Sequence, residues 1–120
     1  MNKKIKVILI STVTIILVVI LTNLFFGNYI THFTSWKWKH MYKVCSLELA
    51  EDIVERKLLD GKNKTEVAEM LNGPHKKEYF ERNDWGYMVT SKFRFYFGFY
   101  DLHVDFDENG IVEKYYVNLD

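Results

Sequence analysis

The chain has 120 residues, which is enough for one small domain but not for two. It contains 16 basic and 16 acidic residues, and this zero net charge argues against nucleic-acid binding, which needs a basic domain. Apolar residues make up 48% of the chain, which excludes disorder, and a single cysteine excludes an internal disulfide framework.

The charges are unevenly distributed along the chain. Residues 1–43 carry six lysines and no acidic residue, whereas residues 44–120 carry ten basic and sixteen acidic groups. The sequence contains no Gly-rich phosphate loop, no nucleophile elbow and no His-Glu-x-x-His zinc motif. We therefore expect an acidic globular part without a cofactor, without nucleic acid as a partner and without enzymatic activity.

The segment from Val7 to Phe26 has 20 residues and no charge. As a helix it crosses a hydrocarbon core of about 30 Å, in which Ser and Thr hydroxyls can bond back to their own helix. It is longer than a signal-peptide core and lacks a small-residue cleavage site, and the only cysteine, Cys45, lies too far along for a lipoprotein signal. We predict an uncleaved, single-pass signal-anchor over residues 1–28, rather than a cleaved leader or a buried core helix.

The lysines around the span indicate its orientation. Lys3, Lys4 and Lys6 crowd its entrance, whereas the first lysine after it is Lys37, so we expect a cytoplasmic N-terminus and a C-terminal domain outside the bacterial cell membrane. Residues 29–44 read as an aromatic and basic juxtamembrane linker. The residues assigned to the membrane interface are Trp36, Lys37, Trp38 and Lys39. Specific recognition of anionic lipids would usually need more clustered basic residues than this.

Two helices are expected after the linker. Apolar residues at helical spacing predict a helix from Ser46 to Leu59 that ends at Asp60–Gly61. Asn63 followed three residues later by Glu66 predicts a capped second helix, which Asn72–Gly73–Pro74 stops. The same Asn63 begins an N-glycosylation pattern, but the helix start is the preferred interpretation.

Alternating residues then predict an antiparallel meander. The candidate strands are Lys77 to Arg82, Trp85 to Thr90, Lys92 to Tyr100, Leu102 to Phe106, and Ile111 to Leu119, with a hairpin turn at Asp107 to Gly110. Two helices followed by three or four antiparallel strands predict an α+β domain over residues 45–120, with the helices on one face of the sheet.

Several of these segments together resemble the SmpA/OmlA domain, the BamE-like accessory lipoprotein of outer-membrane β-barrel assembly. The resemblance rests on Gly61 to Val67, Leu71 to Pro74, Trp85 to Tyr87, and Leu102 to Val112, and it covers about residues 46–119. It implies a two-helix, three- or four-strand fold and non-catalytic extracytoplasmic work, such as scaffolding or inhibiting a partner. This chain has a transmembrane anchor where the family has a lipidated cysteine, so only the domain type carries over.

Two groups of residues could support catalysis or metal binding instead. Cys45 at the mouth of a helix could act as a nucleophile, although a lone cysteine among apolar neighbours usually packs in a core. Asp105, Asp107 and Asn109 match the start of a calcium loop, but Tyr116 stands where its last ligand should be, so an ordinary turn is preferred. A small membrane-tethered hydrolase that uses Cys45 or the acidic hairpin is therefore the less favoured alternative.

Aromatic residues are the remaining unusual feature, with nine between Trp85 and Phe106. One buried sheet face cannot accommodate all of them, and exposed aromatics suit a partner-binding surface. The alternative is that long tyrosine side chains simply cover a thin domain. The predicted partner-binding residues are Trp85, Tyr87, Tyr96, Tyr100 and Tyr116. The expected function is a binding or scaffold domain facing another membrane or cell-envelope protein, with an immunity or inhibitor role as an alternative.

Overall fold

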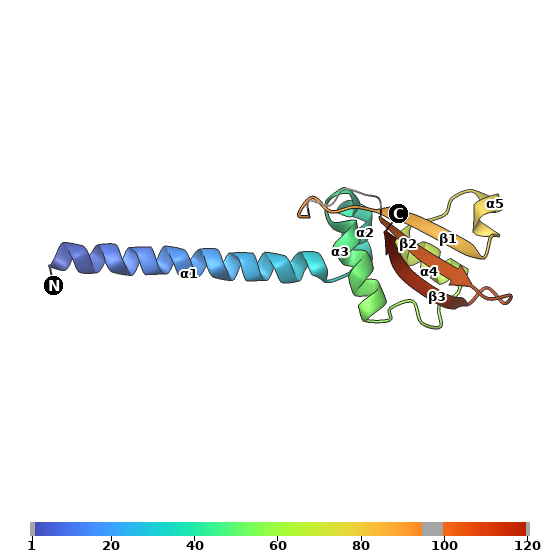
Figure 1. Ribbon diagram of the computed structural model, residues 1–120, viewed down its shortest axis with the longest axis horizontal. Helices are drawn as coiled ribbons and strands as arrows, with labels where there is room; N and C mark the ends of the chain where they lie inside the picture. The colour runs from blue at the N-terminus through green and yellow to red at the C-terminus, as the bar shows by residue number, and fades with distance from the viewer. Residues whose placement is uncertain (1, 95–99, 120) are drawn as a thin grey trace. The chain divides into compact units, whose positions relative to one another are not determined.

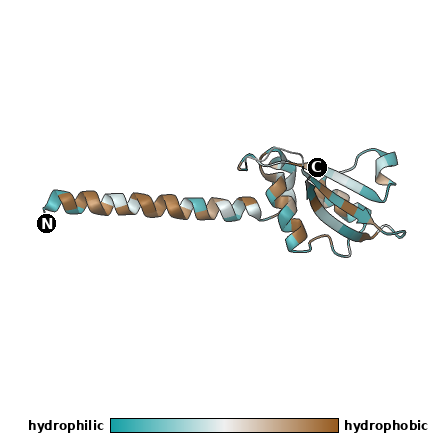
Figure 2. Ribbon diagram, viewed as in Figure 1, coloured by the Kyte–Doolittle hydropathy of each residue, from teal (hydrophilic) through white to brown (hydrophobic). Residues whose placement is uncertain are grey.

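The computed structural model describes residues 2–94 and 100–119, and it divides the chain into two compact units, residues 1–30 and 31–120. The first unit is almost entirely the helix α1 (Lys3–Thr31), whose apolar surface Figure 2 shows along most of its length. It is long and apolar enough to cross a membrane, as predicted. Thr12 and Thr14 donate their hydroxyls to the carbonyl oxygens of Ile8 and Ile10, each at 2.8 Å, so the helix itself satisfies these polar groups.

Two further helices open the second unit, and the first of them and the start of the second lie within residues 29–44, which were predicted to be a linker. They are α2 (Ser35–His40), which begins at the N-cap Thr34, and α3 (Tyr42–Glu55). α3 ends four residues before the predicted Leu59, because Lys57 adopts a left-handed conformation with φ of 55°. In a continued helix Leu59 would lie off the apolar stripe, whereas the turn places it in the core with no exposed surface.

The next helix, α4 (Lys64–Leu71), begins as predicted. Asn63 accepts from the Glu66 amide at 2.9 Å and Glu66 accepts from the Asn63 amide at 3.1 Å, which completes a capping box. Asn72 then takes a left-handed conformation and ends the helix.

The predicted strand at Lys77 to Arg82 is wrong, because this segment forms the short helix α5 (Lys77–Phe80). Its aromatic residues Tyr79 and Phe80 are adjacent and do not alternate with polar residues, and Lys77 pairs with Glu81 at i,i+4 spacing, 3.8 Å apart.

Three antiparallel strands in the order β1-β2-β3 form the sheet (Figure 1): β1 (Asp84–Val89), β2 (Tyr100–Phe106) and β3 (Val112–Leu119). The predicted hairpin after β2 is confirmed, since Asp107 Oδ1 accepts from the Asn109 and Ile111 amides at 2.9 and 3.0 Å. Residues 92–94 of the predicted strand Lys92 to Tyr100 are not in a strand, and residues 95–99 lie outside the described residues.

One face of this sheet is covered by α3 and α4 (Figure 1), and the other is open. The buried residues on the covered face of the strands are Trp85, Val89, Leu102, Val104 and Phe106. The opposite face carries mainly polar or small residues: Asp84, Gly86, Met88, His103, Asp105, Lys114 and Tyr116. The second unit is thus an α+β domain with a three-stranded antiparallel sheet, in agreement with the predicted fold class.

Candidate functional site

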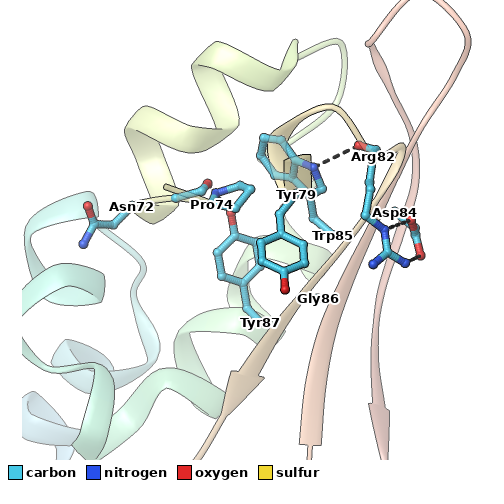
Figure 3. A pocket seen from close by; sticks show the side chains of 9 residues that line it. Asn72, Pro74, Tyr79, Arg82, Asp84, Trp85, Gly86 and Tyr87 are labelled. Carbon is cyan, nitrogen blue, oxygen red and sulfur yellow. Dashed lines mark hydrogen bonds and ion pairs between the residues drawn. The ribbon is translucent and has the colours of Figure 1, made fainter. Parts of the chain in front are cut away.

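An open pocket of about 380 Å³ lies along β1 (Figure 3). Its lining residues come from the end of α4, from α5 and the turn after it, and from β1: Asn72, Gly73, Pro74, Tyr79, Arg82, Asp84, Trp85, Gly86 and Tyr87. Aromatic rings and Pro74 supply apolar surface, while Arg82, Asp84 and Asn72 supply polar groups. A mainly apolar hollow with a few polar groups is the usual form of a binding site.

Two hydrogen bonds fix the aromatic walls of this pocket. The Tyr87 hydroxyl donates to the Gly73 carbonyl oxygen at 2.8 Å, which ties β1 to the chain beyond α4. The Trp85 indole N–H donates to the Arg82 carbonyl oxygen at 3.0 Å, and its ring packs edge-on against Phe106 with centroids 4.6 Å apart. The pocket therefore has walls that are already ordered before anything binds, which lowers the entropic cost of binding.

The outer edge of β1 has no neighbouring strand among the described residues. The Phe106 amide donates to the Asn83 carbonyl oxygen at 2.7 Å, so Asn83 directs its backbone toward β2. In an antiparallel pair, successive residues alternate between directing both backbone groups at the partner strand and directing both away. The residues whose backbone groups point away from β2 are therefore Asp84, Gly86 and Met88.

Thr90, the next residue in that alternation, agrees with this assignment. Its amide donates to Ser46 Oγ at 2.8 Å and its carbonyl accepts from the Leu47 amide at 2.9 Å, so its backbone indeed points away from β2. These bonds to α3 close the end of the edge. Gly86 and Met88 remain exposed, and a Cβ built on Gly86 would meet nothing within 4 Å.

The five predicted partner-binding residues are only partly brought together. Trp85 and Tyr87 meet in the pocket, although both lie on the covered face of the sheet, where Trp85 is 4% exposed. Tyr116 lies on the open face, stacked on His103 with ring centroids 5.3 Å apart. Tyr100 is half-buried at the start of β2 and Tyr96 lies outside the described residues. The assignment of these residues to partner binding stays a prediction.

Sequence reasoning missed the half of the pocket that α5 and the following turn contribute. Tyr79 and Arg82 were placed in a strand, although the run of Lys and Glu around Tyr79 is typical of a helix. The stop at Pro74 was recognised, but nothing in the sequence indicated that the chain there lies beside Tyr87.

Two of the four residues assigned to the membrane interface, Lys37 and Trp38, are buried in the folded unit. Trp38 is 2% exposed, and its indole N–H donates to the Leu71 carbonyl oxygen at 2.9 Å. Lys37 is 6% exposed and its Nζ donates to the His32 carbonyl oxygen at 2.8 Å. Both residues belong to the folded unit because α2 packs against α3 and α4. Trp36 and Lys39 are exposed, and their interfacial role stays a prediction.

Cys45, the residue on which the hydrolase alternative depends, has no exposed surface. Its thiol donates to the Met41 carbonyl oxygen at 3.7 Å. Burial raises the pKa of this thiol and the nearby Glu48 carboxylate raises it further, against a smaller lowering by Lys37. A protonated, enclosed thiol is a poor nucleophile.

A polar cluster beside Cys45 ties residues 90–94 to α3. Glu48 is 4% exposed; its Oε1 accepts from Ser91 Oγ and lies 3.5 Å from Arg94 Nε. Arg94 also forms a two-point pair with Glu51 at 2.6 and 2.9 Å. These bonds use the charged groups to hold one segment on another, which is a structural role.

The acidic hairpin is organised as a turn. Asp107 Oδ1 already accepts two turn amides, and Asp105 lies opposite Lys114 on the open face. Within residues 2–94 and 100–119, no group of three or more His, Cys, Asp or Glu side chains is placed to hold a metal ion.

No family model matches the chain, and neither a curated protein nor a solved structure is significantly similar to it. The function is therefore argued from the geometry of the site.

Proposed function

We propose that this chain is a single-pass membrane protein that presents residues 31–120 outside the cell membrane as a non-catalytic binding domain. Its partner is another membrane or cell-envelope protein. The observation that carries the proposal is the pocket along β1, which combines ordered aromatic walls with an accessible strand edge. An exposed site of this composition is suited to holding part of another protein.

Charge and topology support the extracytoplasmic placement. Lys3, Lys4 and Lys6 precede the span, as expected of its cytoplasmic side. Because residues 31–44 are part of the folded unit, that unit carries 13 basic and 16 acidic groups, and it is less acidic than the sequence alone indicated.

An SmpA/OmlA-like domain type is part of the proposal, supported by the order of helices followed by an antiparallel sheet.

The hydrolase alternative receives little support from the described residues. Cys45 is enclosed and its thiol is protonated, while the acidic hairpin uses Asp107 to build its own turn. In the pocket itself, the described lining residues include neither a cysteine, a serine nor a histidine that could act as a nucleophile or base.

The test is capture of the partner by the pocket in native membranes. A photo-crosslinking residue replaces Tyr79, which is 46% exposed and lines the pocket, or, as the matched control, the exposed Glu113 on β3. We expect one protein adduct from position 79 and a much weaker one from position 113. Equal adducts from both positions, or lipid adducts alone, would contradict the proposal.

Two further measurements separate binding from catalysis and fix the topology. A Cys45→Ser protein should give the same adduct, because the thiol takes no part in binding. Loss of a hydrolytic activity in that protein would instead favour the enzyme. Protease added to intact cells should remove the 31–120 domain, whereas complete protection would reverse the orientation.

A further inference from the structure

We infer that the free edge of β1 takes up an extended segment of the partner protein as a fourth strand, with a bulky apolar side chain in the pocket and a carboxylate beside Arg82 and Lys76. This inference rests on the proposed function and specifies the chemistry of the partner.

The backbone of β1 is arranged for such an addition. Asp84, Gly86 and Met88 direct their N–H and C=O groups away from β2, and all three residues are exposed. Met88 exposes 63% of its surface, and Gly86 has open space where a side chain would stand. These residues are therefore accessible to a peptide, which can add main-chain hydrogen bonds, as in strand addition generally.

The other edge of the sheet is covered at its start. The Val112 amide at the start of β3 donates to the Lys62 carbonyl oxygen at 2.9 Å, and the Tyr115 hydroxyl donates to Asp60 at 2.5 Å. The segment between α3 and α4 thus lies along β3. The two edges differ in that β1 has a pocket beside its outward-facing backbone.

The pocket extends around the edge of β1 from one face of the sheet to the other. Trp85 and Tyr87 line it from the covered face, while Asp84 lines it from the open face, and Gly86 between them contributes no side chain. Figure 3 shows Tyr79 and Tyr87 together on one side of β1 and the Arg82–Asp84 pair on the other. Because side chains of an added strand alternate between faces, every second one would point toward the aromatic walls.

Two basic side chains, Lys76 and Arg82, lie near this pocket, in a segment that also carries Lys77, Glu78, Glu81 and Asp84. Lys76 Nζ lies 5.6 Å from the centre of the Tyr79 ring, and Arg82 lies 3.3 Å from Asp84. Of the nearby carboxylates, Glu81 pairs with Lys77. Arg82 and Asp84 each expose more than half of their side chains, so a ligand carboxylate can replace Asp84 as the partner of Arg82 at little cost. Arg82 can therefore pair with an acidic residue next to the apolar anchor.

The test uses the full chain in phosphatidylcholine nanodiscs and synthetic peptides as probes. The probe is a capped nine-residue peptide of alternating threonine and valine, with phenylalanine at its centre and a neighbouring glutamate. It is titrated to about 10 mM, because a single short strand binds weakly, and the backbone amide signals are followed by NMR. Matched peptides carry lysine in place of the glutamate, or N-methyl groups on alternate amides.

We expect saturable shifts and slower hydrogen exchange at the Gly86 and Met88 amides, while the Val112 and Tyr115 amides stay unchanged. N-methylation should weaken binding by on the order of tenfold or more, because it removes main-chain donors. The lysine peptide should bind several-fold more weakly. Binding that N-methylation leaves intact, changes centred on β3, or no saturable shift would each overturn the inference.

Two substitutions at Met88 test the role of the β1 edge by changing the protein instead of the peptide. Met88→Pro removes an amide that points away from β2, so the ladder to β2 keeps its bonds, and Met88→Thr changes the side chain alone. Met88→Pro should abolish peptide binding and Met88→Thr should not. If the membrane partner still crosslinks at position 79 in the folded Met88→Pro protein, the binding function stands and strand addition is refuted. Assembly through β1 of two copies would appear as a dimer that Met88→Pro disrupts, which would likewise refute the peptide as the occupant.

Discussion

The placement of Trp38 in the domain core predicts a large effect from a small change. Replacing Trp38 by phenylalanine keeps an aromatic ring at a position that lies only twelve residues beyond the predicted span. If Trp38 were a membrane anchor, this exchange would leave the folding of the domain almost unchanged. Because it is a core residue, we expect the domain to lose a substantial part of its stability.

The magnitude follows from the contacts of the indole ring. Its N–H donates to the Leu71 carbonyl oxygen at 2.9 Å, and Leu71 is itself 1% exposed. A buried acceptor that loses its donor costs about 1–3 kcal/mol. The smaller ring also gives up part of the edge contacts with Tyr42 and Tyr87, at centroid distances of 5.0 and 5.9 Å. We expect a loss of about 2 kcal/mol, which lowers Tm by roughly 8–16 °C in a domain of this size.

The assay is thermal unfolding of the full chain in nanodiscs, followed by near-UV circular dichroism, with Trp36→Phe as the control. Trp36 is 59% exposed and stacks on His40, with ring centroids 4.6 Å apart. We expect its replacement to change the free energy of unfolding by less than about 0.5 kcal/mol. A Trp38→Phe protein that unfolds within about 2 °C of the wild type, or a Trp36→Phe protein that is equally destabilised, would refute the packing of α2 against α4.

Three further substitutions probe other parts of the fold. Asp52 accepts from the Phe33 amide at 2.7 Å, and although burial raises its pKa, its hydrogen bonds and ion pair hold that pKa below its usual range. Asp52→Asn should therefore cost about 1 kcal/mol at pH 7. The cost should shrink as the pH falls below about 4, because the unfolded wild type then takes up a proton that the folded state still excludes; urea unfolding at both pH values checks this. Burial and the hydrogen bond to Asp60 raise the pKa of Tyr115 to about 12. Between pH 10 and 12 the folded state therefore keeps a proton that the unfolded state releases, so the free energy of unfolding should fall over this range. The fall should be less steep in the Tyr115→Phe protein. Lys57→Gly should raise Tm by a few degrees, because glycine adopts a φ of 55° without strain.

Local signals in the sequence predicted the parts of the fold that depend on neighbouring residues. The capping box of Asn63 and Glu66 and the hairpin at Asp107 each satisfy backbone groups within four residues of themselves, and both were found where expected. The apolar span is equally local, because a run of uncharged residues defines it. These features need no tertiary contact to be recognised.

The sequence does not reveal the surroundings of residues that depend on distant contacts. Trp38 was assigned to the membrane interface because it follows the span, but its partner Leu71 lies 33 residues away. The pocket likewise depends on the bond between Tyr87 and Gly73, which joins β1 to the end of α4. Trp85 and Tyr87 were therefore found as unusual aromatics, whereas their neighbours across the pocket were not.

The energetics of the β1 edge indicate how such a site would work at a membrane. The outward-facing groups of Asp84, Gly86 and Met88 are already hydrated, so each hydrogen bond to a partner strand contributes only about 1 kcal/mol net. Burying a phenylalanine-sized side chain in the pocket adds about 2 kcal/mol. Because association itself costs at least about 4 kcal/mol, a free peptide should bind no more tightly than about the millimolar range. A partner anchored in the same membrane meets the edge at a much higher effective concentration. Under the proposed function, the apolar helix α1 would therefore be part of the binding mechanism, since the small edge and pocket could select a partner that the membrane had already brought close.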